Sequence, residues 1–143
     1  MAIRLYDLAG AEEDRRFSPY CWRVKMALRH KGLEFETIPW RFTEKDVIAP
    51  HGSATVPVLL DSGHAIHDSW TIAGYLDQAY PSRPALFGST DAHSLAFFFH
   101  QWAIRAVHAP LLKVLILDLF GIVHEKDKAY FRESREKRFG MPL

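Results

Sequence analysis

The stretch FSPYCWRVKMALRHKG, residues 17–32, contains the signals for both ends of one helix. Ser18 is a typical N-cap residue, and proline at position 19 suits the first helical turn. Gly32 follows a basic last turn and favours a C-terminal stop. We therefore predict a helix from Pro19 to Lys31. Its apolar face is formed by Cys21, Val24 and Leu28.

Four short strands are predicted around this helix, at residues 3–7, 33–38, 56–60 and 64–67. Pro39 is expected to end the second strand. Asp61-Ser62-Gly63 has the composition of a tight turn and joins the last two strands as a hairpin. Residues 40–53 show no clear period, which predicts a loop with one helical turn.

A second helix is predicted after the hairpin, capped by Asp68 or Ser69. Its apolar positions are Ile72, Leu76 and Ala79. Prolines 81 and 84 then interrupt the chain, and no strand pattern follows. We predict a long helix over residues 90–120, bent at Pro110, and a charged helix over residues 125–139. The expected division is an α/β domain at residues 1–84 and an all-helical segment at 85–143.

Composition narrows the function classes. Of the 143 residues, 48% are hydrophobic and the net charge is only +1, which predicts a real core and no general attraction for nucleic acid. The most apolar run, residues 111–123, is too short to span a bilayer and contains Lys113 and Asp118. One cysteine permits no intrachain disulfide, and the first residues lack a secretion signal. We expect a cytoplasmic protein without membrane or nucleic-acid partners.

The tetrapeptide Ser18-Pro19-Tyr20-Cys21 looks like a thiol–disulfide active site whose first cysteine is replaced by serine. Capping alone would explain Ser18. Alternatively, its hydroxyl and the helix N-terminus stabilise a thiolate that belongs to a ligand. Cys21, one turn into the helix, is expected to be a packed structural cysteine.

Two further positions carry the same kind of ambiguity. Val56-Pro57 is either an ordinary edge-strand proline or a cis peptide that leaves the Val56 backbone free to pair with an extended ligand. Asp68-Ser69 is either a helix cap or a site for the charged end of a ligand. In the second case Ser69 holds a carboxylate and Asp68 an ammonium group.

Three segments carry a family resemblance: SPYCWRVKMALRHKG, ATVPVLL and HDSWTIAGYLDQAYP. They resemble the thioredoxin-like N-terminal domain of cytosolic glutathione S-transferases, over residues 3 to about 87. Within that superfamily they look most like serine-type enzymes of the β-etherase-like, fungal-type or zeta groups. The resemblance implies a mixed four-stranded sheet followed by part of an all-helical domain.

The resemblance also implies a role for each matching position. Ser18 matches the catalytic serine beside the glutathione sulfur. Val56 matches the residue that pairs with the cysteinyl part, followed by the family's cis-proline at Pro57. Asp68 and Ser69 match the pair that holds the γ-glutamyl end. The candidates for binding the glycine carboxylate are Arg41, Lys45 and His51.

The resulting expectation is a glutathione transferase that uses glutathione as co-substrate against a hydrophobic small electrophile. The resemblance to the β-etherase-like group suggests an aryl-ether-like electrophile. The alternative is a non-catalytic glutathione-binding or regulatory module, favoured by a helical part that is short for the family. Glutaredoxin-like exchange is disfavoured because position 18 lacks a thiol. No metal site is expected, despite eight histidines.

The helical segment also predicts assembly. Residues 97–102 and 111–123 carry more large apolar side chains than one amphipathic face can bury. The resembled family forms twofold dimers through this part of the chain. We therefore expect a homodimer, with helix exchange between subunits as one way to form it.

Overall fold

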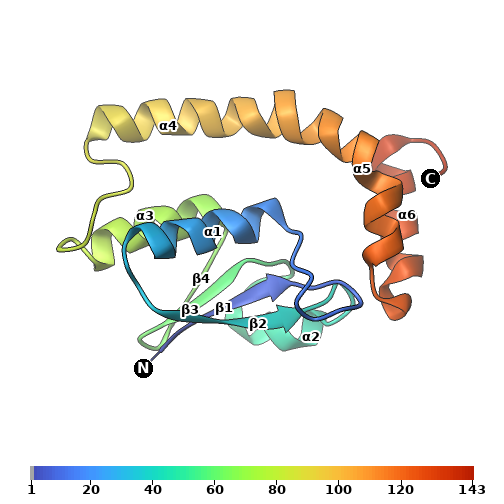
Figure 1. The fold of residues 1–143 in the computed structure, drawn as a ribbon, viewed down its shortest axis with the longest axis horizontal. Coiled ribbons are helices and arrows are strands. Elements are labelled where there is room, and N and C mark those ends of the chain that lie inside the picture. Colours follow the sequence, from blue (N-terminus) through green and yellow to red (C-terminus); the bar gives the residue numbers. More distant parts are fainter. Residues whose placement is uncertain (1) are drawn as a thin grey trace.

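The computed structural model describes residues 2–143 and has a four-stranded mixed sheet at its centre. The strand order is β2-β1-β3-β4, with β1 and β2 parallel and the other pairs antiparallel. The strands are β1 (Ile3–Leu8), β2 (Phe35–Trp40), β3 (Val58–Asp61) and β4 (His64–His67). Helices α1 (Pro19–His30) and α3 (Ser69–Ala79) cover one face, and the short α2 (Lys45–Ile48) lies on the other (Figure 1). This confirms the expected thioredoxin-like fold.

The main core lies between the sheet and the pair α1–α3. Val24 and Leu28 of α1 meet Leu5 of β1 and Ile72 and Leu76 of α3, and all five are almost fully buried. The helical spacing of these apolar residues predicted this packing correctly.

Two strands, β2 and β3, have boundaries that differ from the prediction by two residues. Leu33 still belongs to the turn that ends α1, because its N–H donates to the carbonyl of Leu28 at 3.0 Å. Strand β2 therefore begins at Phe35, and it continues through Pro39 instead of ending there. The reason is that β2 is an edge strand, where a residue without an N–H group is tolerated. Strand β3 begins at Val58, two residues later than predicted, after the Val56-Pro57 peptide.

The helical part is nearly continuous. It contains α4 (Thr90–Trp102), a π-helical stretch (Ala103–His108), α5 (Ala109–Ile122), a short 3₁₀ turn (Glu125–Asp127) and α6 (Lys128–Phe139). The predicted bend is present, since α5 turns away from α4 in Figure 1. The π-helical stretch ends at His108, two residues before Pro110, which has no N–H group for a regular helical hydrogen bond. The charged helix begins at Lys128, after the 3₁₀ turn at its predicted start.

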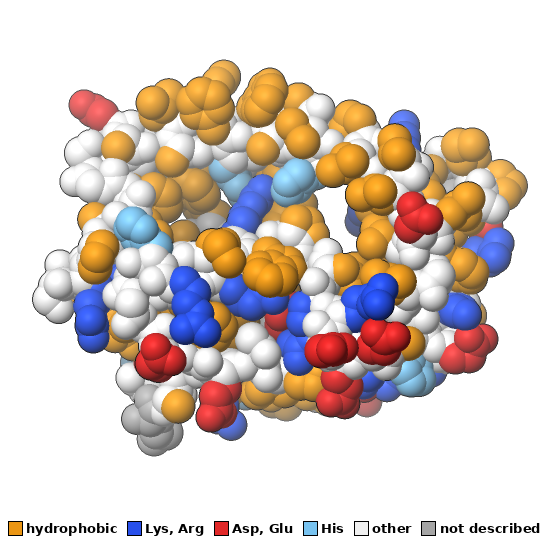
Figure 2. Space-filling model, viewed as in Figure 1, with side chains coloured by type: hydrophobic (Ala, Val, Ile, Leu, Met, Phe, Trp, Pro, Cys, Tyr) orange, Lys and Arg blue, Asp and Glu red, His pale blue; other side chains and the backbone are white. Residues whose placement is uncertain are grey.

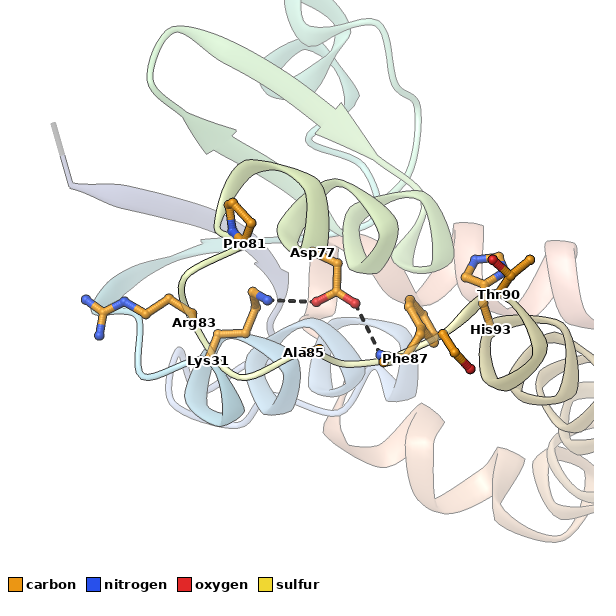
Figure 3. A pocket seen from close by; sticks show the side chains of 10 residues that line it. Lys31, Asp77, Pro81, Arg83, Ala85, Phe87, Thr90 and His93 are labelled. Atoms are coloured by element: carbon orange, nitrogen blue, oxygen red, sulfur yellow. Dashed lines mark hydrogen bonds and ion pairs between the residues drawn. The ribbon is translucent and has the colours of Figure 1, made fainter.

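The linker between the two parts is fastened to α3 by an ion pair whose lysine is buried. Lys31, which is 1% exposed, donates from Nζ to Asp77 at 2.7 Å and to the carbonyl of Pro84 at 3.1 Å. The Asp77 carboxylate also accepts from the N–H groups of Leu86 and Phe87. Figure 3 shows Lys31 and Asp77 pointing toward each other beside a surface cavity. Because these two groups are already paired, we assign them to holding the linker in place.

Helix α4 contacts the thioredoxin-like part through aromatic rings and one polar contact. The Trp70 ring of α3 lies 5.2 Å from that of Phe97 and 4.9 Å from that of His100. Arg23 of α1 places Nη1 2.8 Å from Nδ1 of His100. These contacts set the position of α4 relative to α1.

Much of the apolar surface of α4 and α5 stays exposed. Phe98 is 62% exposed, Val114 76% and Leu117 63%. Figure 2 shows hydrophobic side chains along the upper edge of the molecule, over α4. Among residues 2–143, no helix combines the length and the apolar character needed to cross a membrane.

Candidate functional site

The sheet brings the predicted site segments together at one end of its strands, which is called the sheet edge below. Strands β1, β2 and β4 run in the same direction and end where β3 begins. The register aligns Tyr6, Val58 and His67 across three strands and sets Leu8 opposite Trp40. The chain segments that follow or precede these positions therefore meet at one edge. These segments are residues 9–18, 41–45, 56–57 and 68–69.

Ser18 is the N-cap of α1, with its residue 6% exposed. Its Oγ accepts a hydrogen bond from the N–H of Cys21 at 3.2 Å. A serine hydroxyl has one donor hydrogen besides its acceptor lone pairs, so capping leaves that hydrogen available. The cap and a thiolate-stabilising role are therefore compatible at this position.

Cys21 is fully buried in α1. Burial raises the pKa of its thiol to about 12, although the hydrogen bond with Ser18 acts in the opposite direction. Cys21 is therefore a protonated thiol at neutral pH, which confirms the prediction of a packed structural cysteine.

A buried charge cluster underlies the loop that leads to Ser18, and the sequence reasoning missed it. Asp7, with a completely buried side chain, lies 2.8 Å from Nζ of Lys25 and 3.4 Å from Nη1 of Arg16. The Lys25 ammonium also sits 3.5 Å from the centre of the Trp22 ring. Trp22 in turn donates from Nε1 to the carbonyl of Arg16 at 2.9 Å. Together these contacts fix Arg16, two residues before Ser18.

The Val56-Pro57 peptide bond is cis, as predicted. Val56 lies outside the ladder of β3, whose first paired residue is Val58. Its backbone N–H and C=O are therefore not used by strand pairing. They can bond an extended ligand in the manner of an added strand.

Asp68 is the N-cap of α3 and has a positive φ of 67°. Its Oδ2 accepts from the N–H and the hydroxyl of Thr71, at 2.9 and 3.0 Å. Ser69 is the first residue of α3 and is 5% exposed. The structure thus assigns the cap to Asp68, so the Ser69 hydroxyl is not needed for that purpose.

The three candidates for the glycine carboxylate have different surroundings. Arg41 lies at the sheet edge, where Nε donates to the carbonyl of Gly10 at 3.1 Å. Lys45 is exposed at the start of α2, with Nζ 3.4 Å from the Tyr130 hydroxyl. His51 packs against Tyr6 and lines a cavity that it shares with the β3–β4 hairpin. Of the three, Arg41 is bonded to the loop that leads to Ser18, through the carbonyls of Gly10 and Ala11.

The histidines do not form a metal centre in the described part of the chain. Residues 2–143 contain no group of three or more His, Cys, Asp or Glu side chains placed to hold a metal ion. His93 and His100 instead pack against the Trp70 ring.

Family models match both parts of this chain. Residues 17–79 match the glutathione S-transferase N-terminal domain, and residues 94–143 match the glutathione S-transferase C-terminal domain. The chain belongs to the glutathione S-transferase superfamily. The resemblance deduced from the three sequence segments is thereby confirmed.

The proteins that this chain is similar to include plant and fungal members of the superfamily. Glutathione S-transferase Z1 of Arabidopsis thaliana is 38% identical over 122 residues, which are 80% of this chain and 48% of the relative. Among solved structures, GSTFuA2 of Phanerochaete chrysosporium is 32% identical with a TM-score of 0.86, covering 99% of this chain and 63% of that one. CsGST83044 of Ceriporiopsis subvermispora, solved in complex with glutathione, is 26% identical with a TM-score of 0.88 and covers 98% and 62%. The chain thus spans about half the length of the curated relatives it matches.

Proposed function

We propose that this chain binds glutathione along the sheet edge and activates its thiol through Ser18. The observation that carries the proposal is the meeting of three segments at one edge: Ser18 at the start of α1, the unpaired Val56 backbone, and Ser69 at the start of α3. Relatives solved with glutathione support it. We further propose that residues 1–84 form the glutathione-binding domain.

Each group has one task in this proposal. The Val56 backbone pairs with the cysteinyl residue of glutathione and places its sulfur near Ser18. The γ-glutamyl carboxylate is held by the Ser69 hydroxyl and free N–H groups of α3, while Asp68 faces the ammonium group. Arg41 or Lys45 supplies a positive charge for the glycine carboxylate. These contacts fix both ends of the peptide.

The chemistry then needs only a stabilised thiolate. The thiol gives its proton to solvent, and the Ser18 O–H together with the α1 N-terminus stabilises the remaining negative charge. The thiolate attacks an electrophilic carbon, a C–S bond forms, and the leaving group departs with its electron pair. We propose that the electrophile is a small apolar molecule. More specifically, we propose an aryl ether, from which a phenolate leaves.

Thiolate absorbance against pH tests this proposal directly. Replacing Ser18 with Ala removes one hydrogen bond to a charged group, which costs roughly 1.5–3 kcal/mol. We expect the pKa of the bound thiol to rise by about 1 to 2 units, while glutathione still binds. Ser82→Ala, an exposed serine in the linker, is the matched control. An unchanged titration in Ser18→Ala would reduce Ser18 to a cap.

A further inference from the structure

Asp127 is a buried carboxylate far from Ser18 in sequence that contacts the loop after β2. Its side chain is completely buried. Oδ2 accepts from the N–H of Phe42 at 2.9 Å, and Oδ1 accepts from the N–H of Thr43 at 3.0 Å and from its hydroxyl at 2.5 Å. Bonds from three donors to one carboxylate are charge-assisted and define the geometry closely. One residue of the helical part therefore fixes the backbone between Arg41 and Lys45.

Aromatic packing strengthens the same connection. The Phe42 ring lies 5.7 Å from the Phe131 ring and 6.0 Å from the Tyr130 ring, both on α6. It also lies 6.3 Å from the ring of Phe17, the residue before Ser18. Phe42 is thus held between α6 and the segment that presents Ser18.

The loop after β1 rests on the same part of the helical segment. Ala11 donates its N–H to the carbonyl of Ile122 at 2.8 Å. A Cβ atom added to Gly10 would lie 2.6 Å from that carbonyl oxygen, so only glycine fits this approach. Arg41 joins the two loops by donating to the carbonyls of Gly10 and Ala11. Residues 122–131 therefore support both loops at the sheet edge.

We propose that Asp127 is a positioning residue that sets the 41–45 loop to receive the glycine end of glutathione. This inference rests on the proposed function, because it assumes glutathione as the ligand. Asp127 itself does not touch the ligand. It holds Phe42 and Thr43, and thereby determines where Arg41 and Lys45 present their positive charges. The helical segment thus becomes part of the binding site's framework.

A pair of ligands isolates this role. Glutathione ends in the glycine carboxylate. γ-Glutamylcysteine lacks the whole glycine residue and ends in a carboxylate on its cysteinyl residue, at the Val56 side of the site. In Asp127→Asn the side-chain amide keeps one oxygen that can accept a hydrogen bond. Its NH₂ group replaces the other oxygen and cannot accept from a backbone N–H, so Phe42 and Thr43 are no longer both bonded. We expect calorimetric titration to show about a ten-fold loss of affinity for glutathione and little change for γ-glutamylcysteine. A general loss of stability would lower the affinity for both ligands to the same extent.

Two more variants keep the test decisive. Thr43→Val removes only the hydroxyl donor to Asp127 and should give a smaller loss, about two- to three-fold, again for glutathione alone. It serves in place of Asp127→Asn if that chain does not fold. Asp118→Asn, an exposed carboxylate on α5, should bind both ligands like the wild type.

The outcomes separate this inference from the function on which it rests. A wild type that binds glutathione, with equal losses for both ligands in Asp127→Asn and Thr43→Val, overturns the positioning role alone. Unchanged glutathione affinity in both variants overturns it too. A wild type that binds neither ligand overturns the proposed function and this inference with it.

Discussion

At the scale of single residues, position 18 shows why a cap and a functional group are hard to separate from sequence. The sequence predicted the cap, and the structure confirms it through the bond from Cys21 N–H to Ser18 Oγ. The functional role depends on the remaining hydroxyl hydrogen, which no sequence pattern reports. Cys21 was predictable because its place on the apolar face of the helix implied burial.

Exchanging the serine for a thiol tests the geometry at this position. Ser18→Cys, incubated with glutathione disulfide, should form a mixed disulfide while one glutathione thiolate leaves. The helix N-terminus lowers the pKa of a thiol placed there. Mass spectrometry should find one adduct per chain at position 18, and none on Cys21, whose pKa burial raises to about 12. The wild type is the control, and the absence of an adduct in the variant would contradict the proposed ligand position.

At the scale of secondary-structure elements, the start of α3 separates ligand binding from stability. Asp68, not Ser69, caps the helix, so Ser69→Ala should change the melting temperature little. Losing a charge-assisted hydrogen bond to the γ-glutamyl carboxylate should lower the affinity for glutathione by about ten-fold or more. Asp68→Asn is a matched variant because asparagine caps equally well but has no charge for the ammonium group. Parallel losses of melting temperature and affinity in Ser69→Ala would support a purely structural serine.

The contact between α1 and α4 predicts a pH dependence of stability. Burial, followed by the charge of Arg23, lowers the pKa of His100 below its ordinary value of 6.5, with His108 acting in the same direction and Asp68 against it. The unfolded chain therefore binds a proton at a higher pH than the folded chain. The contribution of neutral His100 to the free energy of unfolding is fully present above pH 6.5. It is lost as the pH falls through the lowered pKa. Thermal melts from pH 7.5 to 5 should show this decline, and His100→Gln should flatten it. An equally steep decline in the variant would contradict the assignment.

Elements were predicted more accurately than their connections. Periodicity and capping located α1, α3 and β4 within a residue, because those signals are local. Strand β2 was misplaced since tolerance of Pro39 depends on its position at the edge of the sheet. The pairs Asp7–Lys25 and Lys31–Asp77 could not be predicted, because nothing local marks which charges meet after folding. For the same reason Asp127 did not enter the sequence-based site.

At the scale of the whole molecule, the exposed apolar surface of α4 and α5 supports the proposed homodimer. The exposed side chains on these helices include Phe98, Val114 and Leu117. A large exposed apolar surface of this kind usually marks an interface with another protein chain. Light scattering at micromolar concentration should give twice the chain mass. Phe98→Glu combined with Val114→Glu should shift the mass toward the monomer, whereas Val47→Glu on α2 should not. A folded wild-type monomer would contradict this assembly.

Calorimetric titration of this chain decides whether it holds glutathione through the sheet edge at Ser18. The titration uses glutathione and, in parallel, S-hexylglutathione, whose apolar tail occupies the place of an electrophile. We expect saturable binding of both ligands, with one ligand per chain. A flat titration with both ligands would contradict it.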